Sequence, residues 1–261
     1  MREFTFRDKI AVVTGASSGI GRATALALAQ RGAKVALAAR RVELLEEVAA
    51  QIRQADGEAL VVPTDVSEPF QIDNLIREVL SRWGQVDILV SNAGQYIRRT
   101  TTELDAEVIQ ASMRVNFFSH LHAVLAALPH MLERRSGHIV LVSTMNGKKG
   151  IRPDAPYAAA KFALNGLGEV MRQELREQGI AVVLILPGRV DTPLIENLKV
   201  PWISAKISPQ AVAKAILRGI ERNQAEVYVP PYVKLLYIVN ALSPRLGDLI
   251  ARSFHLQGLE T

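Results

Sequence analysis

The sequence has 261 residues and contains no cysteine. Disulfides, thiolate metal sites and a cysteine nucleophile are therefore excluded. No run of about 20 apolar residues occurs, so we expect no membrane-spanning helix. The first ten residues, MREFTFRDKI, are charged and lack the apolar core of a signal peptide, which favours a cytoplasmic protein.

The signatures of several other function classes are also missing. No Gly-x-Ser-x-Gly motif indicates a hydrolase, and no acidic cluster has the spacing of a metal site, so we predict no metal. The net charge is +5, but lysine and arginine are spread along the chain, which favours a solvated basic surface over nucleic-acid binding. His120 and His122 are two positions apart on a predicted helix and do not face each other, so we interpret them as packing or surface residues.

Apolar runs and helical patterns alternate along the first two-thirds of the chain. Strands with almost no polar position are typical of a parallel sheet that is covered by helices on both faces. The sequence therefore predicts a single α/β domain over residues 1–261, with a doubly wound parallel sheet of the Rossmann type. The predicted strands are residues 9–14, 34–39, 59–63, 86–91, 138–142 and 180–186, and the predicted helices are residues 20–30, 42–54, 70–81, 106–132 and 156–178.

A glycine-rich turn follows the first predicted strand and opens the first predicted helix. Gly15 permits a tight turn, Gly19 lets the backbone approach a pyrophosphate, and Gly21 lets the helix pack closely on the sheet. The helix N-terminus then offers free N–H groups and the positive end of its dipole to phosphates. The predicted dinucleotide-binding residues of this turn are Gly15, Ser17, Ser18, Gly19, Ile20 and Gly21.

The run TGASSGIG at residues 14–21 resembles the cofactor fingerprint of the short-chain dehydrogenase/reductase family. The resemblance extends over about residues 8–193, with motifs in the family's order and spacing. The other matching motifs are Asp65-Val66, Asn92-Ala93-Gly94, Asn116, Tyr157 with Lys161, and Pro187-Gly188. The resemblance implies an oxidoreductase that uses a nicotinamide dinucleotide.

The end of the second predicted strand indicates which dinucleotide binds. NAD-dependent enzymes usually carry an acidic residue there, which accepts a hydrogen bond from the ribose 2′-OH. This chain has Ala39, followed by Arg40 and Arg41, and a guanidinium holds a 2′-phosphate that a carboxylate would repel. We therefore predict NADP(H), with Ser18 at the position where many NADP-dependent relatives have a basic residue.

Further cofactor contacts are implied by the resemblance. Asp65 is expected to meet the adenine amino group, and Val66 is expected to pack near the ring. The Val190 backbone is expected to bind the nicotinamide amide, and Thr192 the amide or a phosphate. The remaining expected contacts are Asn92, Ala93, Gly94, Pro187 and Gly188. For Asn92, a structural role in locking the central strand stays open beside the cofactor role.

Tyr157 and Lys161 are four positions apart near the start of a predicted helix, so they lie on one face, one turn apart. A phenol titrates at about pH 10, and a nearby ammonium favours the phenolate. Tyr157 is therefore predicted to exchange a proton with a ketone or alcohol oxygen. By resemblance, both residues also contact the cofactor, and Lys161 binds the nicotinamide ribose.

Two more members of the catalytic set are implied by the resemblance. The family places a serine thirteen residues before the tyrosine, and here that position holds Thr144, whose hydroxyl has the same donor and acceptor capacity. Ser143 is the alternative hydroxyl. Asn116 is expected to hold a helix irregularity and a water in a proton relay to Lys161, and the alternative is a buried helix-capping amide.

The resulting prediction is an NADP(H)-dependent enzyme that transfers hydride between the nicotinamide and a small-molecule carbonyl or secondary alcohol. The main alternative is a nonenzymatic NADP-binding regulator on the same fold, because a fold does not determine a function. Epimerisation or dehydration would also retain the tyrosine and the lysine. Turnover of NADPH with a panel of ketones separates these three hypotheses.

Residues 193–261 are expected to cover the substrate, as the region after the Pro-Gly motif does in the family. The apolar residues that follow Thr192 favour a hydrophobic substrate. Residues 232–242 are also largely apolar and are too few to span a bilayer. We expect them to cover the domain's own core or to form the subunit interface of a homo-oligomer. The alternative is weak peripheral membrane contact through an amphipathic helix.

Overall fold

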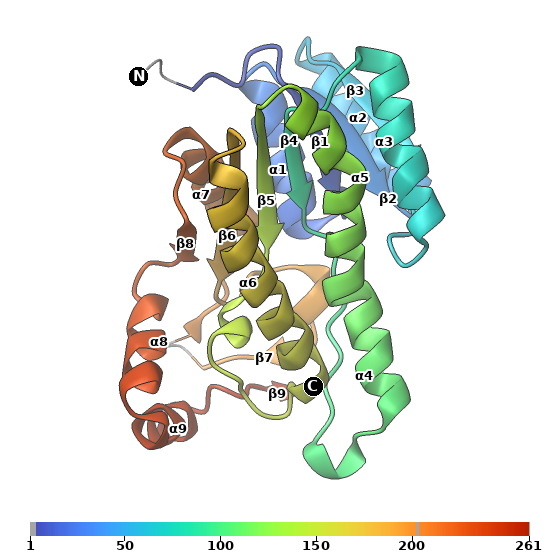
Figure 1. The fold of residues 1–261 in the computed structure, drawn as a ribbon. Coiled ribbons are helices and arrows are strands. Elements are labelled where there is room, and N and C mark those ends of the chain that lie inside the picture. The colour runs from blue at the N-terminus through green and yellow to red at the C-terminus, as the bar shows by residue number, and fades with distance from the viewer. Residues whose placement is uncertain (1–3, 202–203, 261) are drawn as a thin grey trace.

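The computed structural model describes residues 4–201 and 204–260. Its main sheet has seven parallel strands in the order β3-β2-β1-β4-β5-β6-β8 (Figure 1). These strands are β1 (Ile10–Thr14), β2 (Lys34–Ala39), β3 (Ala59–Pro63), β4 (Ile88–Ser91), β5 (Gly137–Val142), β6 (Ile180–Pro187) and β8 (Glu226–Val229). A separate antiparallel pair joins β7 (Leu198–Lys199) to β9 (Leu259–Glu260).

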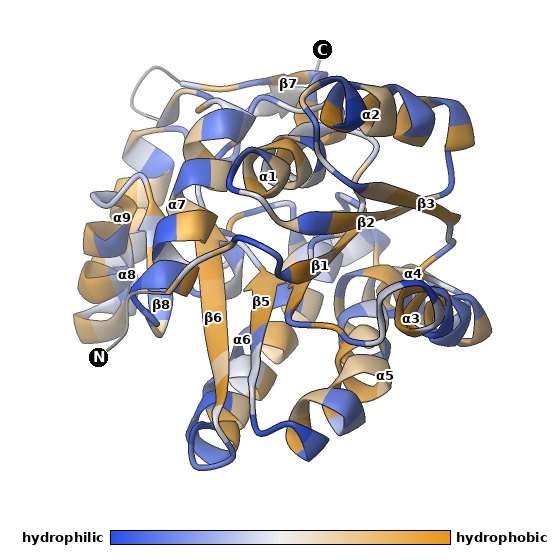
Figure 2. Ribbon diagram, turned by 90° about the horizontal axis from the view of Figure 1, so that it is seen from above, coloured by the Kyte–Doolittle hydropathy of each residue, from blue (hydrophilic) through white to orange (hydrophobic). Residues whose placement is uncertain are grey.

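Helices cover both faces of the sheet, with α1, α2 and α7 on one face and α3, α5 and α6 on the other (Figure 2). The α-helices are α1 (Gly19–Gln30), α2 (Val42–Gln54), α3 (Pro69–Trp83), α4 (Ala106–Met113), α5 (Ser119–Glu133), α6 (Ala155–Arg176), α7 (Pro209–Glu221), α8 (Val233–Leu242) and α9 (Pro244–Ser253). The 3-10 helices are η1 (Thr101–Glu103), η3 (Met145–Gly147) and η4 (Pro193–Ile195), and η2 (Arg114–Phe118) is a π-helix. The predicted doubly wound α/β fold is confirmed.

Burial on both faces explains why the strand sequences do not alternate between polar and apolar residues. In β1, Val12 packs in the core on the α3–α5 side, and its neighbour Val13 packs in the core on the α1–α2 side. Both valines are fully buried, and such burial stabilises a fold by about 1.5–3 kcal/mol for each side chain. Figure 2 shows the same hydrophobic character along β5 and β6.

The strand order changes direction between β1 and β4. From β1 the chain builds outward to β2 and β3, and it then returns to the other side of β1 to build β4, β5 and β6. The loops at the carboxyl ends of β1 and β4 therefore leave in opposite directions. In open α/β sheets, ligands bind in the crevice at this point, so the topology alone locates the candidate site.

The predicted helical stretch over residues 106–132 is present, but it is not one regular α-helix. The structure divides it into α4, the π-helix η2 and α5. A π-helix contains more residues per turn than an α-helix, so it changes the direction in which the following side chains point. Within the described ranges, no helix is both long enough and apolar enough to cross a membrane.

Candidate active site

A cavity of about 1040 Å³ lies at the carboxyl ends of the central strands. The loops that follow β1, β4, β5 and β6 line it, together with α8 and α9. The predicted cofactor-binding and catalytic motifs therefore meet around one space, although more than 170 residues separate Gly15 from Thr192 along the chain. The site is built from strand ends and the segments that follow them.

The turn after β1 depends on glycine at two places. A Cβ atom on Gly21 would lie 2.2 Å from the carbonyl oxygen of Gly15, which leaves no room for any side chain. Gly19 has a φ of +53°, and a Cβ there would lie 2.8 Å from Thr192 Cγ2. The loop consequently closes tightly at the N-terminus of α1, where free backbone N–H groups favour phosphate binding.

Arg41 lies beside this loop and contacts two of its hydroxyls. Its Nη2 atom donates to Ser17 Oγ at 3.1 Å and to Ser18 Oγ at 2.9 Å. Arg40 is largely exposed, and its Nη1 atom lies 4.0 Å from Asp65 Oδ2. The guanidinium of Arg41, just before α2, therefore lies next to the hydroxyls of Ser17 and Ser18.

Asn92 binds the end of β1. Its backbone N–H donates to Thr14 Oγ1 at 2.9 Å, and its Nδ2 atom donates to the Thr14 carbonyl at 2.9 Å. The Ala93 N–H also donates to Thr14 Oγ1, at 3.1 Å. Of the two roles left open for Asn92, these contacts favour the structural one, since they hold the ends of β1 and β4 together.

Tyr157 and Lys161 lie on the first turns of α6, in keeping with their spacing of four, and both side chains are buried. Lys161 Nζ lies 5.9 Å from the centre of the Tyr157 ring and donates to the Val142 carbonyl at 3.1 Å. Burial lowers the pKa of Lys161 to about 7. Burial and the charge of Asp154 raise the pKa of Tyr157, so the expected lowering by the ammonium does not dominate in this structure.

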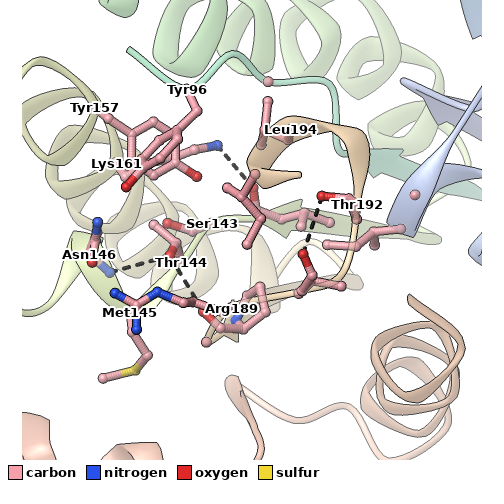
Figure 3. Close-up of a pocket in the computed structure, with 18 of the residues that line it drawn as sticks. Tyr96, Ser143, Thr144, Met145, Asn146, Tyr157, Lys161, Arg189, Thr192 and Leu194 are labelled. Atoms are coloured by element: carbon pink, nitrogen blue, oxygen red, sulfur yellow. Dashed lines mark hydrogen bonds between the residues drawn. The ribbon is translucent and has the colours of Figure 1, made fainter. Parts of the chain in front are cut away.

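The two candidate hydroxyls differ in their surroundings. A side-chain hydrogen bond with Thr144 acts to lower the pKa of Tyr157. The buried Ser143 hydroxyl has no hydrogen-bond partner among the described residues. Figure 3 shows Thr144, Tyr157 and Lys161 around the same part of the cavity. This arrangement favours Thr144 over Ser143 as the hydroxyl beside the phenol.

Asn116 lies in the π-helix η2 and is fully buried. Its Nδ2 atom donates to the Gln95 carbonyl at 2.8 Å and to Ser112 Oγ at 3.1 Å, and its Oδ1 atom accepts from the Gln95 N–H at 3.0 Å. The side chain therefore fixes the segment after Asn92-Ala93-Gly94 to the helix irregularity. The irregularity that the resemblance implied is present, and the amide is committed to structural contacts.

His120 is buried and also contacts Lys161 directly, a contact that its interpretation as a packing or surface residue did not include. Its ring is fully buried, with Nδ1 at 2.8 Å from Ser91 Oγ and Nε2 at 3.3 Å from Lys161 Nζ. Helical periodicity gave no signal for this contact, because η2 precedes α5 and redirects its first turn. His122 makes a ring contact with Phe118, in keeping with a packing role.

Sequence reasoning also missed a buried polar cluster beside Tyr157. Asp154 accepts hydrogen bonds from Tyr96 Oη at 2.7 Å and Asn146 Nδ2 at 2.6 Å, and it pairs with Arg98 Nε at 3.1 Å. The rings of Tyr96 and Tyr157 meet edge to face at 5.0 Å between centroids. The cluster therefore fixes the Tyr96 ring that packs against the candidate proton donor.

The expected nicotinamide-side residues follow β6. The Gly188 N–H donates to the Val229 carbonyl at 2.7 Å, and Thr192 Oγ1 donates to the Val190 carbonyl at 3.3 Å. Val190 also pairs with Ile207 as an isolated bridge. The loop after Pro187 lines the cavity through Arg189 and Thr192 (Figure 3), and Thr192 also lies beside Gly19 of the glycine-rich turn.

Comparison with known proteins gives the family. Residues 9–200 match the short chain dehydrogenase family. The chain belongs to this family. An uncharacterized oxidoreductase of Staphylococcus aureus is 37% identical over 228 residues, which is 86% of this chain and 97% of that protein. One from Staphylococcus epidermidis is 34% identical over 229 residues, which is 86% of this chain and 98% of the relative.

Solved structures of short-chain dehydrogenases share the fold. A short chain dehydrogenase/reductase from Burkholderia phymatum, in complex with NAD, superposes with a TM-score of 0.86 at 27% identity, over 93% of this chain and 96% of that chain. A short-chain type dehydrogenase/reductase from Mycobacterium marinum gives a TM-score of 0.80 at 28% identity, over 86% and 94%. The protein is therefore an oxidoreductase of the short-chain dehydrogenase family.

The C-terminal end of this short-chain dehydrogenase returns to the cavity. Arg98 Nη2 donates to the Gln257 carbonyl at 2.7 Å, and Arg189 donates to the Leu256 carbonyl and to Ser204 Oγ. The β7–β9 pair ties the chain end to the segment after Thr192. Trp202 and Ile203, which the sequence places in the apolar cover, lie outside the described residues. In the ranges that are described, no cluster of three or more His, Cys, Asp or Glu side chains is arranged for a metal ion.

Proposed function

We propose that the chain is an NADP(H)-dependent oxidoreductase that interconverts a hydrophobic carbonyl compound and its secondary alcohol. The convergence of Tyr157, Lys161 and Thr144 on a cavity that also contains the phosphate loop carries this proposal. A nonenzymatic NADP-binding regulator would not require a buried phenol beside a buried lysine. The proposal extends the family assignment to a cofactor, a reaction and a class of substrate.

The proposed preference for NADP(H), whose adenosine ribose carries a 2′-phosphate, is based on the residues at the end of β2. Ala39 ends the strand without a carboxylate, and the guanidinium of Arg41 meets the hydroxyls of Ser17 and Ser18. Arg40 is free to turn toward the same side, because it is largely exposed. A phosphate would gain charge-assisted hydrogen bonds from such groups, whereas a 2′-hydroxyl would find no acceptor at Ala39.

The rest of the dinucleotide would be held along the cavity. Asp65 and Val66 would meet the adenine, Lys161 the nicotinamide ribose, and Val190 and Thr192 the nicotinamide amide. All five residues line the cavity, which supports the assignment. When bound, the nicotinamide supplies or accepts the hydride.

Tyr157 would transfer the proton. Because burial and Asp154 raise its pKa, the phenol stays protonated across the neutral range and is ready to donate to a ketone oxygen. Thr144 would orient that oxygen through its hydroxyl. In the reverse direction Tyr157 would first lose its proton, and its phenolate would then take up the proton of the alcohol.

The substrate side of the cavity supports an apolar substrate. Residues 193–261 supply the lining there and return over it through the carbonyls of Leu256 and Gln257. The apolar side chains of this segment that line the cavity are Leu194, Ile195, Leu198, Val233, Leu235, Leu236, Val239, Ile250, Phe254 and Leu256. An apolar lining with a few polar groups at one end favours a hydrophobic molecule with one reacting oxygen.

A panel of carbonyls and alcohols with both cofactors tests the proposed function. Long-chain or polycyclic ketones should consume NADPH much faster than NADH, and faster than small polar carbonyls do. Binding of NADPH without turnover of any panel member would favour the regulator. Faster reduction of small polar carbonyls would contradict the apolar substrate.

The choice between the two hydroxyls gives a separate prediction. Thr144→Ala should lower kcat by about tenfold or more, because it removes a hydrogen bond at the reacting oxygen. Thr144→Ser should retain most activity, and Ser143→Ala should lose less than Thr144→Ala. Steady-state rates of the three variants test this, and a greater loss in Ser143→Ala would reassign the role to Ser143.

An exposed apolar face lies on and next to α8 and α9 (Figure 1), and some of its residues also line the cavity. No residue of α8 is buried, so the helix does not simply cover the domain's own core. The face consists of Tyr232, Leu235, Ile238, Leu242, Leu246, Leu249 and Phe254. Three members of this apolar face, Tyr232, Leu235 and Phe254, also line the cavity, so the face forms part of its rim.

We propose that the apolar face rests on a lipid surface from which the substrate enters. Lys234, Arg245 and Arg252 are exposed near it, and the acidic Asp248 is already paired with Lys149. Apolar side chains flanked by cations favour the interface of an anionic bilayer. A second copy of the chain is the competing occupant, but it would cover the rim of the cavity.

The variant Leu242→Glu with Leu249→Glu tests this contact. The unmodified chain should co-sediment with phosphatidylglycerol vesicles, and the double variant should stay in the supernatant. Leu125→Glu, at a 54% exposed position on α5, is the matched control and should behave like the unmodified chain. If the unmodified chain stays in the supernatant and the double variant converts an oligomer to a smaller species in sedimentation velocity, the face is a subunit interface.

A further inference from the structure

His120 joins the central sheet to the candidate catalytic lysine. Its ring lies in the first turn of α5, fully buried. One ring nitrogen, Nδ1, is 2.8 Å from Ser91 Oγ at the end of β4, and the other, Nε2, is 3.3 Å from Lys161 Nζ on α6. Three elements that are distant in the sequence therefore meet through one imidazole.

The contacts determine which ring nitrogen carries the proton. Burial, reinforced by the charge of Lys161, holds the pKa of His120 well below its usual value, so the ring is neutral at physiological pH. An ammonium group only donates hydrogen bonds, so Nε2 must accept from Lys161. The proton is then on Nδ1, which donates to Ser91 Oγ.

We propose that His120 is a positioning residue for Lys161, which it holds as one of two fixed hydrogen-bond acceptors. The carbonyl of Val142 is the other acceptor, at 3.1 Å from Lys161 Nζ. With two N–H groups committed, the ammonium has one N–H left for the cavity. The role of this N–H group toward the cofactor ribose and Tyr157 rests on the proposed function. The contacts of His120 with Ser91 and Lys161 do not depend on that function.

The electrostatic surroundings of Lys161 make the His120 acceptor important for the charge of the lysine. Burial lowers the pKa of Lys161 to about 7, and no carboxylate of the described chain is among the causes that act on Lys161 or on His120. Tyr157 on the same helix and Asp154 before it are the other titratable groups nearby, and Asp154 acts on Tyr157. The ammonium is thus held by neutral acceptors alone, and losing one of them disfavours the charged form.

The test measures the lysine itself, in the folded full-length chain. Lysine labelled with ¹³C at Cε is titrated by NMR, and the Lys161 signal is assigned by its loss in Lys161→Arg. His120→Leu should lower the Lys161 midpoint by about one pH unit or more, the scale of a lost hydrogen bond to a charge. His120→Gln, which returns an acceptor, should restore it to within about half a unit. His122→Leu, on the same helix, is the control and should leave it unchanged.

Two results would overturn the positioning role. One is an unchanged Lys161 midpoint in His120→Leu, and the other is a ¹⁵N spectrum that places the ring proton on Nε2. If His120→Leu does not fold, Ser91→Ala decides: it removes the hydroxyl that contacts Nδ1 and should lower the midpoint in the same direction. No shift there contradicts the proposal.

Catalytic activity is measured separately in the same variants. If the unmodified chain turns over a carbonyl, His120→Leu should lower kcat more than it raises KM and should move the alkaline limb of the kcat profile to lower pH. If no carbonyl or alcohol is turned over while His120→Leu still shifts the Lys161 midpoint, the proposed function fails and the positioning of Lys161 is supported.

Discussion

Replacing Tyr157 with phenylalanine should reduce turnover by at least about 10²-fold, the usual scale of general acid catalysis. The substitution removes only the phenolic oxygen, and the ring can keep its edge-to-face contact with Tyr96. NADPH affinity should therefore change little. Steady-state NADPH consumption measures the first effect, and fluorescence titration of the cofactor measures the second.

The matched control for this substitution is Tyr237→Phe, which removes a hydroxyl from α8 outside the cavity lining. It should turn over at close to the rate of the unmodified chain. Near-normal turnover in Tyr157→Phe would remove Tyr157 from the mechanism. A large loss of NADPH affinity in Tyr157→Phe would instead indicate that the phenol mainly binds the cofactor.

Replacing Arg41 with alanine should weaken NADPH binding by about 10- to 150-fold and leave NADH binding nearly unchanged. The range corresponds to about 1.5–3 kcal/mol for a lost hydrogen bond to a charged group, at tenfold for each 1.4 kcal/mol. Arg41 is chosen over Arg40 because Arg41 is the residue that donates hydrogen bonds to Ser17 and Ser18. Isothermal titration with each cofactor measures both affinities.

Arg40→Ala is the comparison for that variant. The Arg40 side chain is 78% exposed and its Nη1 atom lies 4.0 Å from Asp65 Oδ2, so its loss should weaken NADPH binding less than the loss of Arg41 does. Equal losses for NADPH and NADH in Arg41→Ala would contradict a 2′-phosphate contact. Tighter binding of NADH than of NADPH by the unmodified chain would contradict the predicted cofactor.

The parts of the site that could be predicted are those encoded locally. Buried parallel strands appear as short apolar runs, and the glycine spacing from Gly15 to Gly21 follows from the geometry of one turn. The pairing of Tyr157 with Lys161 needs only the helical repeat. Each of these features is confined to fewer than ten consecutive residues, so the sequence displays it directly.

The parts that could not be predicted depend on contacts across the chain. His120 meets Ser91, 29 residues away, and Lys161, 41 residues away, because η2 redirects the start of α5. Asp154 gathers Tyr96 and Asn146 from two other segments. The apolar pattern of α5 is the same with or without a π-helix before it, so periodicity had no means of detecting the change in direction.

The most direct test of the proposed reaction follows deuterium from the cofactor to the product. NADPH labelled at either face of C4 is incubated with a long-chain ketone and the chain, and the alcohol is analysed by mass spectrometry. The account predicts deuterium at the carbinol carbon from one labelled form only, at a rate that falls at least about 10²-fold in Tyr157→Phe. Alcohol without deuterium from either form, or the same rate in Tyr157→Phe, would contradict the account.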